Sequence, residues 1–291
     1  MKIGMFAINY GTCADPETAI EIARHAEAAG FESLWSGEHI VLPDPRPPGF
    51  TMPPTLPFLD TSVALTWVAA HTSTIKVASG IIVLPLRNPV ILAKELASID
   101  VISRGRLIAG FAAGYVSQEF TSAGVPMVGR GERMEDYIRA MRALWAMDSP
   151  QYQGRFVSFT GIDAHPRPMQ RPGPPVVVGG EAPAALRRAI TLADGWYGFG
   201  LDLDETRHYI DALRQLGEQL SRPPELGRLE FTITPVGKLD RATVERYSEL
   251  GVDRLVLLPE PDADRPHRHS PVPADRIKHN IDKVADEIIA A

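Results

Sequence analysis

The chain is short of cysteine, of excess positive charge and of long apolar runs. Cys13 is the only cysteine in 291 residues, so no internal disulfide can form. Thirty Lys plus Arg against thirty-six Asp plus Glu give a formal net charge of −6, which offers no basic face to nucleic acid. No apolar stretch reaches the roughly 20 residues that a membrane-crossing helix needs, and no secretory leader precedes Met1-Lys2-Ile3. We therefore expect a cytoplasmic protein that binds neither nucleic acid nor membrane.

Motifs for several kinds of chemistry are also missing. The histidines show no H-E-x-x-H spacing, and His267 and His269 lie in a polar, proline-flanked stretch, so we expect no metal site. No G-x-S-x-G segment is present to place a serine nucleophile on a sharp turn, and no P-loop lysine signature occurs. The sequence therefore argues against metal-assisted hydrolysis, serine hydrolysis and P-loop phosphoryl transfer.

Strand-like and helix-like patterns alternate along the whole chain. Most strand candidates are continuous apolar runs, as expected for parallel strands that are buried on both faces. They lie at residues 2–8, 33–36, 75–81, 106–112, 175–179, 195–199, 229–235 and 254–258. Eight such units favour one (β/α)8 TIM barrel domain over residues 1–291. A doubly wound sheet with a small extra domain stays open as the alternative.

Helix signals fall in the gaps between these runs. Asp15-Pro16 and Asn88-Pro89 each supply a capping side chain and a first-turn proline, and Gly30 and Gly105 follow the ends of the two helices. Helical spacing of apolar residues also indicates helices near residues 134–145, 182–193, 204–220, 244–250 and 277–288.

Two segments interrupt this regularity and predict long loops after strands 2 and 4. Seven of the residues from Pro43 to Pro57 are proline, which excludes a helix or an inner strand. Residues 149–174 hold a short hairpin pattern and a proline-rich return to the fifth strand. We expect both segments near one end of the barrel, as lids or binding walls. The apolar pocket wall would use Phe50, Met52, Phe58, Tyr152 and Phe156.

A few residues stand where a barrel carries its chemistry. His39 closes the second strand, and active sites of barrels lie at the carboxyl ends of strands, although a lone histidine is also common as a packed residue. Gly179 and Gly180 end the fifth strand and open a helix, where bare amides can hold a phosphate or merely form a tight turn. Glu38 is interpreted as an anchor of its turn, and Cys13 as a small apolar residue near the mouth.

At these positions the sequence resembles a known family. Trp35-Ser36-Gly37-Glu38-His39, continued to Pro43, is similar to the W-x-x-E-H-x-x-x-P segment of the luciferase-like monooxygenase superfamily. Further matching segments follow in the family's order at 80–89, 93–100, 103–107, 110–120, 176–180 and 193–196. The resemblance implies a (β/α)8 barrel that holds FMN or the deazaflavin coenzyme F420 at its carboxyl-terminal mouth. It is most similar to the actinobacterial F420-dependent subgroup.

The resemblance also implies roles for single residues. His39 would face the reactive C5 of the deazaflavin as a contact or proton relay. Gly80, Ile81 and Ile82 would form a bulge behind the ring, often built with a non-proline cis peptide. Gly179 and Gly180 would bind the cofactor phosphate. Asp100, Ser103 and Arg106 would be structural, tying a helix to the fourth strand.

Two departures from family patterns bear on the cofactor and on the substrate. FMN-type luciferases carry an arginine directly before the glycine that matches Gly114, where this chain has Ala113, which favours F420. F420-dependent sugar-phosphate dehydrogenases carry a glutamate where this chain has Tyr115, which argues against sugar-phosphate oxidation. Gly114 is counted with the cofactor-binding residues, and Tyr115 is the second catalytic candidate.

The resemblance therefore implies an enzyme that transfers hydride between F420 and a small organic substrate. An FMN-dependent monooxygenase using reduced flavin and O2 is the first alternative. A non-catalytic flavin-binding barrel is the second, and a barrel with an unrelated ligand is the third. The family also implies a homodimer.

Overall fold

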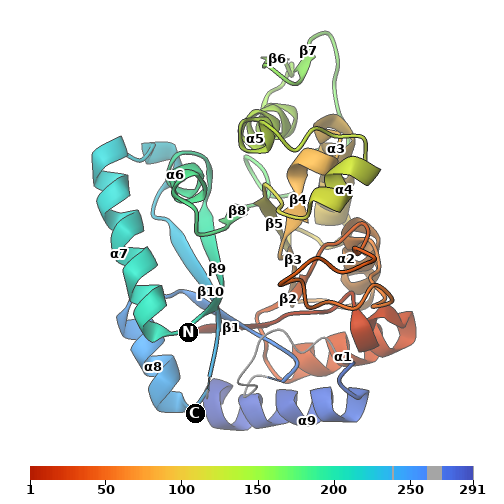
Figure 1. The fold of residues 1–291 in the computed structure, drawn as a ribbon, viewed down its shortest axis with the longest axis vertical. Helices are drawn as coiled ribbons and strands as arrows, with labels where there is room; N and C mark the ends of the chain where they lie inside the picture. Colours follow the sequence, from red (N-terminus) through yellow and green to blue (C-terminus); the bar gives the residue numbers. More distant parts are fainter. Residues whose placement is uncertain (238, 261–270, 291) are drawn as a thin grey trace.

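Eight parallel strands close into a barrel around which the helices are arranged (Figure 1). The computed structural model describes residues 1–237, 239–260 and 271–290. The strands are β1 (Lys2–Met5), β2 (Ser33–Ser36), β3 (Lys76–Ser79), β5 (Leu107–Ala112), β8 (Val176–Gly179), β9 (Gly195–Leu201), β10 (Glu230–Pro235) and β11 (Arg254–Leu257). The β1–β11 and β3–β5 pairings close the ring, so the predicted TIM barrel is confirmed and an open doubly wound sheet is excluded.

The third barrel strand is interrupted. After β3 the chain makes a cis peptide between Gly80 and Ile81 and then resumes as β4 (Ile82–Val83), which pairs with the end of β5. The bulge expected from the resemblance, with its non-proline cis peptide, is therefore present at the residues named for it.

In the described part of the chain eight helices cover the barrel. They are α1 (Pro16–Ala28), α2 (Thr61–His71), α3 (Pro89–Ile102), α5 (Arg130–Ala146), α6 (Pro183–Leu192), α7 (Leu203–Leu220), α8 (Arg241–Glu249) and α9 (Ala274–Val284). The predicted caps are in place, since the Asp15 carboxylate accepts from the Thr18 N–H and the Asn88 side chain from the Val90 N–H. The helix α2 was not predicted from the sequence, because apolar residues on its outer side, such as Val63 and Trp67, hide the helical period.

The core divides into an inner and an outer part, because side chains of each strand alternate in direction. Six of the eight barrel strands send one side chain into the interior, and Phe6 and Ala7 join them directly after β1. That inner cluster consists of Phe6, Ala7, Trp35, Ala78, Ile108, Val177, Tyr197 and Val256. Neighbours such as Leu34 and Val77 point outward into the larger cluster beneath the helices. The barrel is thus a packed core and leaves its ends to carry function.

The amino-terminal end of the barrel is held by charge. Arg254, which is fully buried, donates to both oxygens of Glu32 at 2.8 and 2.9 Å and to Thr232 at 3.0 Å. Its guanidinium also lies 5.7 Å from the centre of the Trp35 ring, and Lys2 pairs with Glu230 beside it. This end is therefore closed by ion pairs, and the opposite end is the one available to a ligand.

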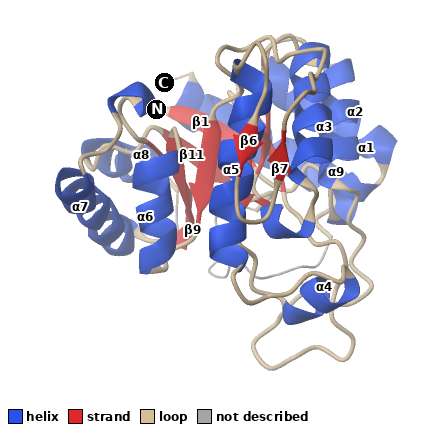
Figure 2. Cartoon of the chain, turned by 90° about the horizontal axis from the view of Figure 1, so that it is seen from above, coloured by secondary structure: helices blue, strands red, loops and turns tan. Residues whose placement is uncertain are grey.

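The segment 149–174 lies in a different place from the one expected. It follows α5, and its hairpin, β6 (Tyr152–Gln153) and β7 (Ser158–Phe159), packs on the outer side of that helix (Figure 2). The Tyr152 hydroxyl donates to Asp136 at 2.7 Å, and the guanidinium groups of Arg133 and Arg155 lie 4.7 and 5.0 Å from the centre of the Phe156 ring. The expectation that Tyr152 and Phe156 line a pocket wall was wrong, because polar partners on α5 hold both side chains outside the barrel.

The long segment that does follow the fourth barrel strand runs from residue 113 to 129. It contains a short helix, α4 (Ser117–Ser122), which lies among the loops at one end of the barrel (Figure 2). The proline-rich segment after β2 occupies the same end, where Tyr10 forms a bridge with Phe58. Among the residues that the structure describes, no helix combines the length and apolar character needed to cross a membrane.

Asp100, Ser103 and Arg106 are structural, as expected. Both Asp100 oxygens accept from Gln170, at 2.9 Å from its backbone N–H and 2.7 Å from its side-chain amide. The Arg106 guanidinium donates to backbone carbonyls that include those of Ala69 and Thr72. These contacts join α3, the end of α2 and the start of β5.

Candidate functional site

The end of the barrel formed by the carboxyl ends of the strands, the mouth, carries Tyr10, His39, Phe58, Ile81, Tyr115 and Phe199. Tyr10, Ile81 and Phe199 are partly buried against the inner cluster and form its floor. Tyr10 stacks on Phe58 with ring centres 4.5 Å apart, and Phe199 lies 5.3 Å from the Phe6 ring. Such a floor presents flat, apolar surfaces to a ligand.

His39 stands at the rim of this mouth with a side chain only 8% exposed. Three aromatic rings meet it edge to face, with ring centres at 5.6 Å for Phe58, 5.8 Å for Phe50 and 6.2 Å for Tyr115. The two predicted catalytic residues, His39 and Tyr115, are therefore neighbours. Three rings fix the plane of the imidazole, so its nitrogens point in defined directions.

Glu119 belongs to this site but was not predicted from the sequence. It lies on α4, its side chain is 1% exposed, and its Oε1 lies 3.3 Å from His39 Nδ1 and accepts from the Ile40 N–H at 3.0 Å. Only its position one turn after Tyr115 could have drawn attention to it. The signal was weak because a glutamate on a short polar helix is usually exposed.

Glu38, next to His39, anchors the rim as expected. Its buried carboxylate accepts from the Val83 N–H at 2.6 Å and from Arg87 Nε at 3.1 Å. Arg87 also reaches Asp60 at 2.6 Å, and Asp60 caps α2 by accepting from the Val63 N–H at 3.2 Å. One guanidinium thus joins the end of β2, the segment after β4 and the start of α2.

The charges in this network oppose the effect of burial. Burial raises the pKa of Glu38, and the adjacent Arg87 guanidinium counteracts that rise. Burial alone would lower the pKa of Arg87, but the charges of Glu38 and Asp60 outweigh it and raise that pKa. Arg87 therefore keeps its positive charge beneath the rim.

The bulge at Gly80, Ile81 and Ile82 sends one side chain across the barrel. A Cβ atom at Gly179 would lie 2.2 Å from Ile81 Cδ1, and one at Gly110 would lie 2.7 Å from Ile81 Cγ2. Ile81 therefore fills the space that two glycines leave open on β5 and β8. The absence of a side chain at Gly179 is explained by this packing, whatever its amide binds.

The turn after β5 has a cation beside it, although this chain has Ala113 where FMN-type luciferases carry an arginine. Gly114 has a φ of 79°, and a Cβ atom there would lie 2.5 Å from Val83 Cγ1, so both conformation and space require glycine. The Gly114 carbonyl accepts from Arg130 Nε, at the start of α5, at 2.9 Å. A guanidinium thus stands beside Gly114 although the sequence has no arginine next to it.

Gly179 and Gly180 lead into α6 at the same end of the barrel. The helix begins with Pro183, which has no N–H, after Ala182, which provides no side-chain cap. The Ala185 N–H donates to the Ala182 carbonyl at 2.7 Å, so within the described residues Ala184 carries the first amide of the helix that is left for a ligand. Gly180 has a φ of 111°, and its carbonyl accepts from Trp196 Nε1 at 3.0 Å. Partial burial and the charge of Glu205 raise the pKa of Glu181, which follows directly. The turn can accept an anion, with one carboxylate close by.

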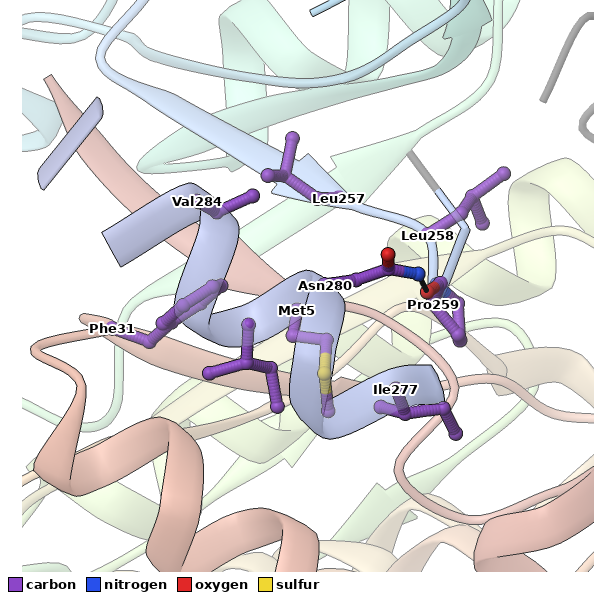
Figure 3. Close-up of a pocket in the computed structure, with 9 residues that line it drawn as sticks. Met5, Phe31, Leu257, Leu258, Pro259, Ile277, Asn280 and Val284 are labelled. Carbon is purple, nitrogen blue, oxygen red and sulfur yellow. Dashed lines mark hydrogen bonds between the residues drawn. The ribbon is translucent and has the colours of Figure 1, made fainter. Parts of the chain in front are cut away.

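The described residues also form hollows elsewhere, one of about 390 Å3 beside α1 and α2, lined by residues such as Trp67 and His71, and one of about 560 Å3 at the β6–β7 hairpin. The cavity beneath α9, lined by residues such as Met5, Phe31 and Asn280, has about 10 Å3, room for one water molecule (Figure 3). Cys13 is buried in the outer core, and burial raises the pKa of its thiol to about 12. Within residues 1–237, 239–260 and 271–290 no cluster of three or more His, Cys, Asp or Glu side chains could hold a metal, and His267 and His269 lie outside these ranges.

Comparison with known proteins finds a family model, curated relatives and solved structures that are similar to this chain. The family model described as luciferase-like monooxygenase matches residues 1–266. An uncharacterised protein of Mycobacterium tuberculosis is 31% identical over 259 residues, covering 85% of this chain and 89% of that protein. The oxygenase component of the flavin-dependent trigonelline monooxygenase of Acinetobacter baylyi is 32% identical over 59% of this chain and 45% of its own length. An F420-dependent secondary alcohol dehydrogenase, solved with an F420-acetone adduct, superposes with a TM-score of 0.78 at 17% identity over 99% of this chain and 98% of that one.

Proposed function

The chain belongs to the luciferase-like monooxygenase family of oxidoreductases, and on that premise we propose that it transfers hydride between coenzyme F420 and a small organic substrate. The observation that carries the proposal is the arrangement of the mouth. An imidazole held edge-on, the Ile81 bulge with its apolar floor, and the uncapped start of α6 all lie at one end of one barrel. These are the parts needed to hold a flat ring and an attached phosphate.

The described residues fit such a cofactor. The side chains of Ile81, Tyr10 and Phe199 provide an apolar platform for the ring, and the amides at Gly179 and Gly180 with the Ala184 N–H at the start of α6 provide donors for a phosphate. Bound there, F420 supplies a two-electron hydride centre at C5. The cofactor-binding residues of this proposal are Gly80, Ile81, Ile82, Gly114, Gly179, Gly180 and His39.

The chain's own contribution is enclosure, alignment and proton transfer. The aromatic side chains of Phe50 and Phe58 exclude water from the face of the mouth next to His39, and a rigid floor aligns hydride donor and acceptor. His39 holds or takes the proton that accompanies the hydride, and Tyr115, whose ring lies 6.2 Å from the imidazole, is the second candidate for this step.

The runner-up is an FMN-dependent monooxygenase that receives reduced flavin and uses O2. Arg130 favours it, because its guanidinium at the Gly114 carbonyl restores a cation where Ala113 removes one. The trigonelline monooxygenase relative is named as flavin-dependent. A non-catalytic flavin-binding barrel is the third function that this site could have.

A paired titration tests the proposal. The purified protein is titrated with F420 and, separately, with FMN, and binding is followed by fluorescence. We expect micromolar binding of F420, and hydride transfer from reduced F420 to at least one member of a panel of small ketones, aldehydes and enones. Micromolar FMN binding without F420 binding, together with O2 consumption by reduced FMN, would overturn it in favour of the monooxygenase.

We also propose that the chain forms a homodimer. Four large apolar side chains are exposed on the neighbouring helices α2 and α3: Val63 at 64%, Trp67 at 42%, Ile91 at 60% and Ile102 at 45%. Exposed apolar side chains on adjacent helices are typical of a protein interface. Sedimentation velocity of the wild type and of Ile91→Lys measures this, and a wild-type monomer at micromolar concentration would refute it.

A further inference from the structure

Glu119 and His39 meet across the mouth from distant parts of the chain. Glu119 belongs to α4, after the fourth barrel strand, whereas His39 follows the second strand. Both side chains are buried, at 1% and 8% exposure, and Oε1 lies 3.3 Å from Nδ1. The same oxygen accepts from the Ile40 N–H at 3.0 Å, so the carboxylate is held against the rim by two groups of adjacent residues.

The surroundings of Glu119 differ from those of the other buried glutamate nearby. Glu38 is neutralised by Arg87, but within the described part of the chain Glu119 pairs with no lysine or arginine. A buried carboxylate without a cationic partner is costly to maintain. His39 is the side chain within hydrogen-bonding distance of the Glu119 carboxylate. The buried position of Glu119 is therefore explained if its carboxylate orients the His39 imidazole.

A carboxylate in this place determines which imidazole nitrogen carries hydrogen. An ionised carboxylate only accepts hydrogen bonds, so the nitrogen facing it must be Nδ1–H. In the neutral ring Nε2 is then the unprotonated nitrogen. It makes no hydrogen bond to any residue within the described ranges, so its lone pair is left for a ligand.

We propose that Glu119 is a positioning residue that holds His39 as its Nδ1–H tautomer and leaves Nε2 as the proton acceptor of the site. The inference rests on the proposed function for its consequence in catalysis, but the tautomer itself is a property of the protein without cofactor. The edge-to-face contacts of Phe50, Phe58 and Tyr115 complete the positioning by fixing the ring plane.

The tautomer is measured by two-dimensional NMR of the full-length protein labelled with 15N in its histidine rings. Spectra are recorded without cofactor, at a pH where the ring is neutral, and the His39 signals are identified by their loss in His39→Asn. In the wild type we expect hydrogen on Nδ1 and none on Nε2. A His39 that carries its hydrogen on Nε2 would overturn the proposal.

Two variants test whether Glu119 is the cause. Glu119→Gln has the same shape and keeps an acceptor for the Ile40 N–H, but its amide can turn either oxygen or nitrogen toward Nδ1, so we expect the ratio of tautomers to fall at least about tenfold toward a mixture. Gln118→Ala, at an exposed position of the same helix, is the control and should keep the wild-type ratio. An unchanged ratio in Glu119→Gln would overturn the proposal, because the carboxylate would then not set the tautomer.

A kinetic measurement connects the tautomer to turnover. Loss of the partner that orients a metal-ligating histidine typically costs about 10- to 100-fold in activity, and we expect the same scale for a histidine that moves a proton. With reduced F420 and a carbonyl compound that the wild type reduces, we expect Glu119→Gln to lower kcat by that factor and to leave KM within about threefold. A kcat equal to that of the wild type would overturn the catalytic part. If no F420-dependent turnover is found at all, the proposed function fails while the tautomer result stands on its own.

Discussion

The side-chain amide of Asn9 pairs with both backbone groups of Gly37. Asn9 Nδ2 donates to the Gly37 carbonyl at 2.8 Å, and Oδ1 accepts from the Gly37 N–H at 2.8 Å. Nδ2 also donates to the Leu59 carbonyl at 2.9 Å. A fully buried amide thus continues the pairing of β1 and β2 beyond the point where the strands end, at the residue that directly precedes Glu38 and His39 in the chain.

Replacement of Asn9 by alanine is therefore expected to destabilise the protein. The change leaves the buried N–H of Gly37 without an acceptor, which costs about 1–3 kcal/mol in free energy of unfolding. Urea denaturation measures the loss. Thr61→Val is the matched control, since Thr61 Oγ1 donates only a further bond to the Gly37 carbonyl, at 2.9 Å. A loss in Thr61→Val as large as that in Asn9→Ala would contradict this account.

The ion pair at the amino-terminal end predicts a dependence of stability on pH. Burial raises the pKa of Glu32, but hydrogen bonds and charge from Arg254 outweigh it and lower the pKa from its ordinary 4.5 to about 2. A carboxyl group with a lowered pKa in the folded state stabilises the protein above its unfolded pKa, and this contribution is lost as pH falls from about 5 to 2. Its size is about 3 kcal/mol.

Denaturation of the wild type and of Glu32→Gln at a series of pH values checks this dependence. The difference in free energy of unfolding should be largest at pH 6–7 and should shrink below about pH 4. Glu249→Gln, on the outer helix α8, controls for loss of one carboxylate elsewhere. A difference between wild type and Glu32→Gln that does not change with pH would refute the assignment.

Two glycines that face Ile81 should respond differently to alanine. At Gly110 a Cβ atom would lie 2.0 Å from the backbone oxygen of Ser79, which cannot move aside, so Gly110→Ala should lower the free energy of unfolding by about 1–3 kcal/mol or more. At Gly179 the obstacle is the end of the Ile81 side chain, 2.2 Å away, which can be shortened. Gly179→Ala combined with Ile81→Ala should therefore recover stability, measured by thermal unfolding, whereas Gly110→Ala with Ile81→Ala should not.

His39→Asn separates an enzyme from a binding protein. If His39 moves the proton, kcat should fall by about 10²- to 10⁴-fold while the fold and most of the cofactor affinity remain. Turnover of reduced F420 with an accepted carbonyl compound and fluorescence titration measure the two quantities. His208→Asn on the outer helix α7 is the control. Unchanged turnover in His39→Asn would remove the imidazole from the mechanism.

Glu181→Gln tests the start of α6 as the phosphate position. The Glu181 carboxylate follows Gly180 directly, so its charge opposes an anion at the first amides of the helix. Its removal should tighten F420 binding by about two- to fivefold, and the gain should shrink as salt is added. Glu218→Gln, at the far end of α7, is the control. An unchanged or weaker affinity in Glu181→Gln would place the phosphate elsewhere.

The sequence patterns that predicted secondary structure correctly are local. Continuous apolar runs predicted all eight barrel strands, and the caps at Asp15 and Asn88 marked where α1 and α3 begin. These features depend on neighbours within one turn or one strand, so periodicity and capping residues are enough to identify them. The helix α2 was not predicted, because the apolar residues on its outer side hide the helical period on which such a prediction depends.

The contacts of the site depend on residues far apart in the chain. Glu119 meets His39 from 80 residues away, and Arg87 meets Glu38 from 49 residues away. The Tyr152 side chain lies away from the mouth, because its hydroxyl donates to a carboxylate on α5. No local pattern encodes such partners, because they are brought together only when the strands close into a ring.

The sequence by itself determined the order of the eight barrel strands and the end of the barrel at which His39 stands, and its resemblance to a known family indicated the position of the bulge. The tertiary structure alone decided which buried charge faces which partner, which glycines make room for Ile81 and which loop borders the mouth. The physical reason is that secondary structure is selected by short-range periodicity and capping, whereas burial and pairing of polar side chains are selected by packing between distant segments.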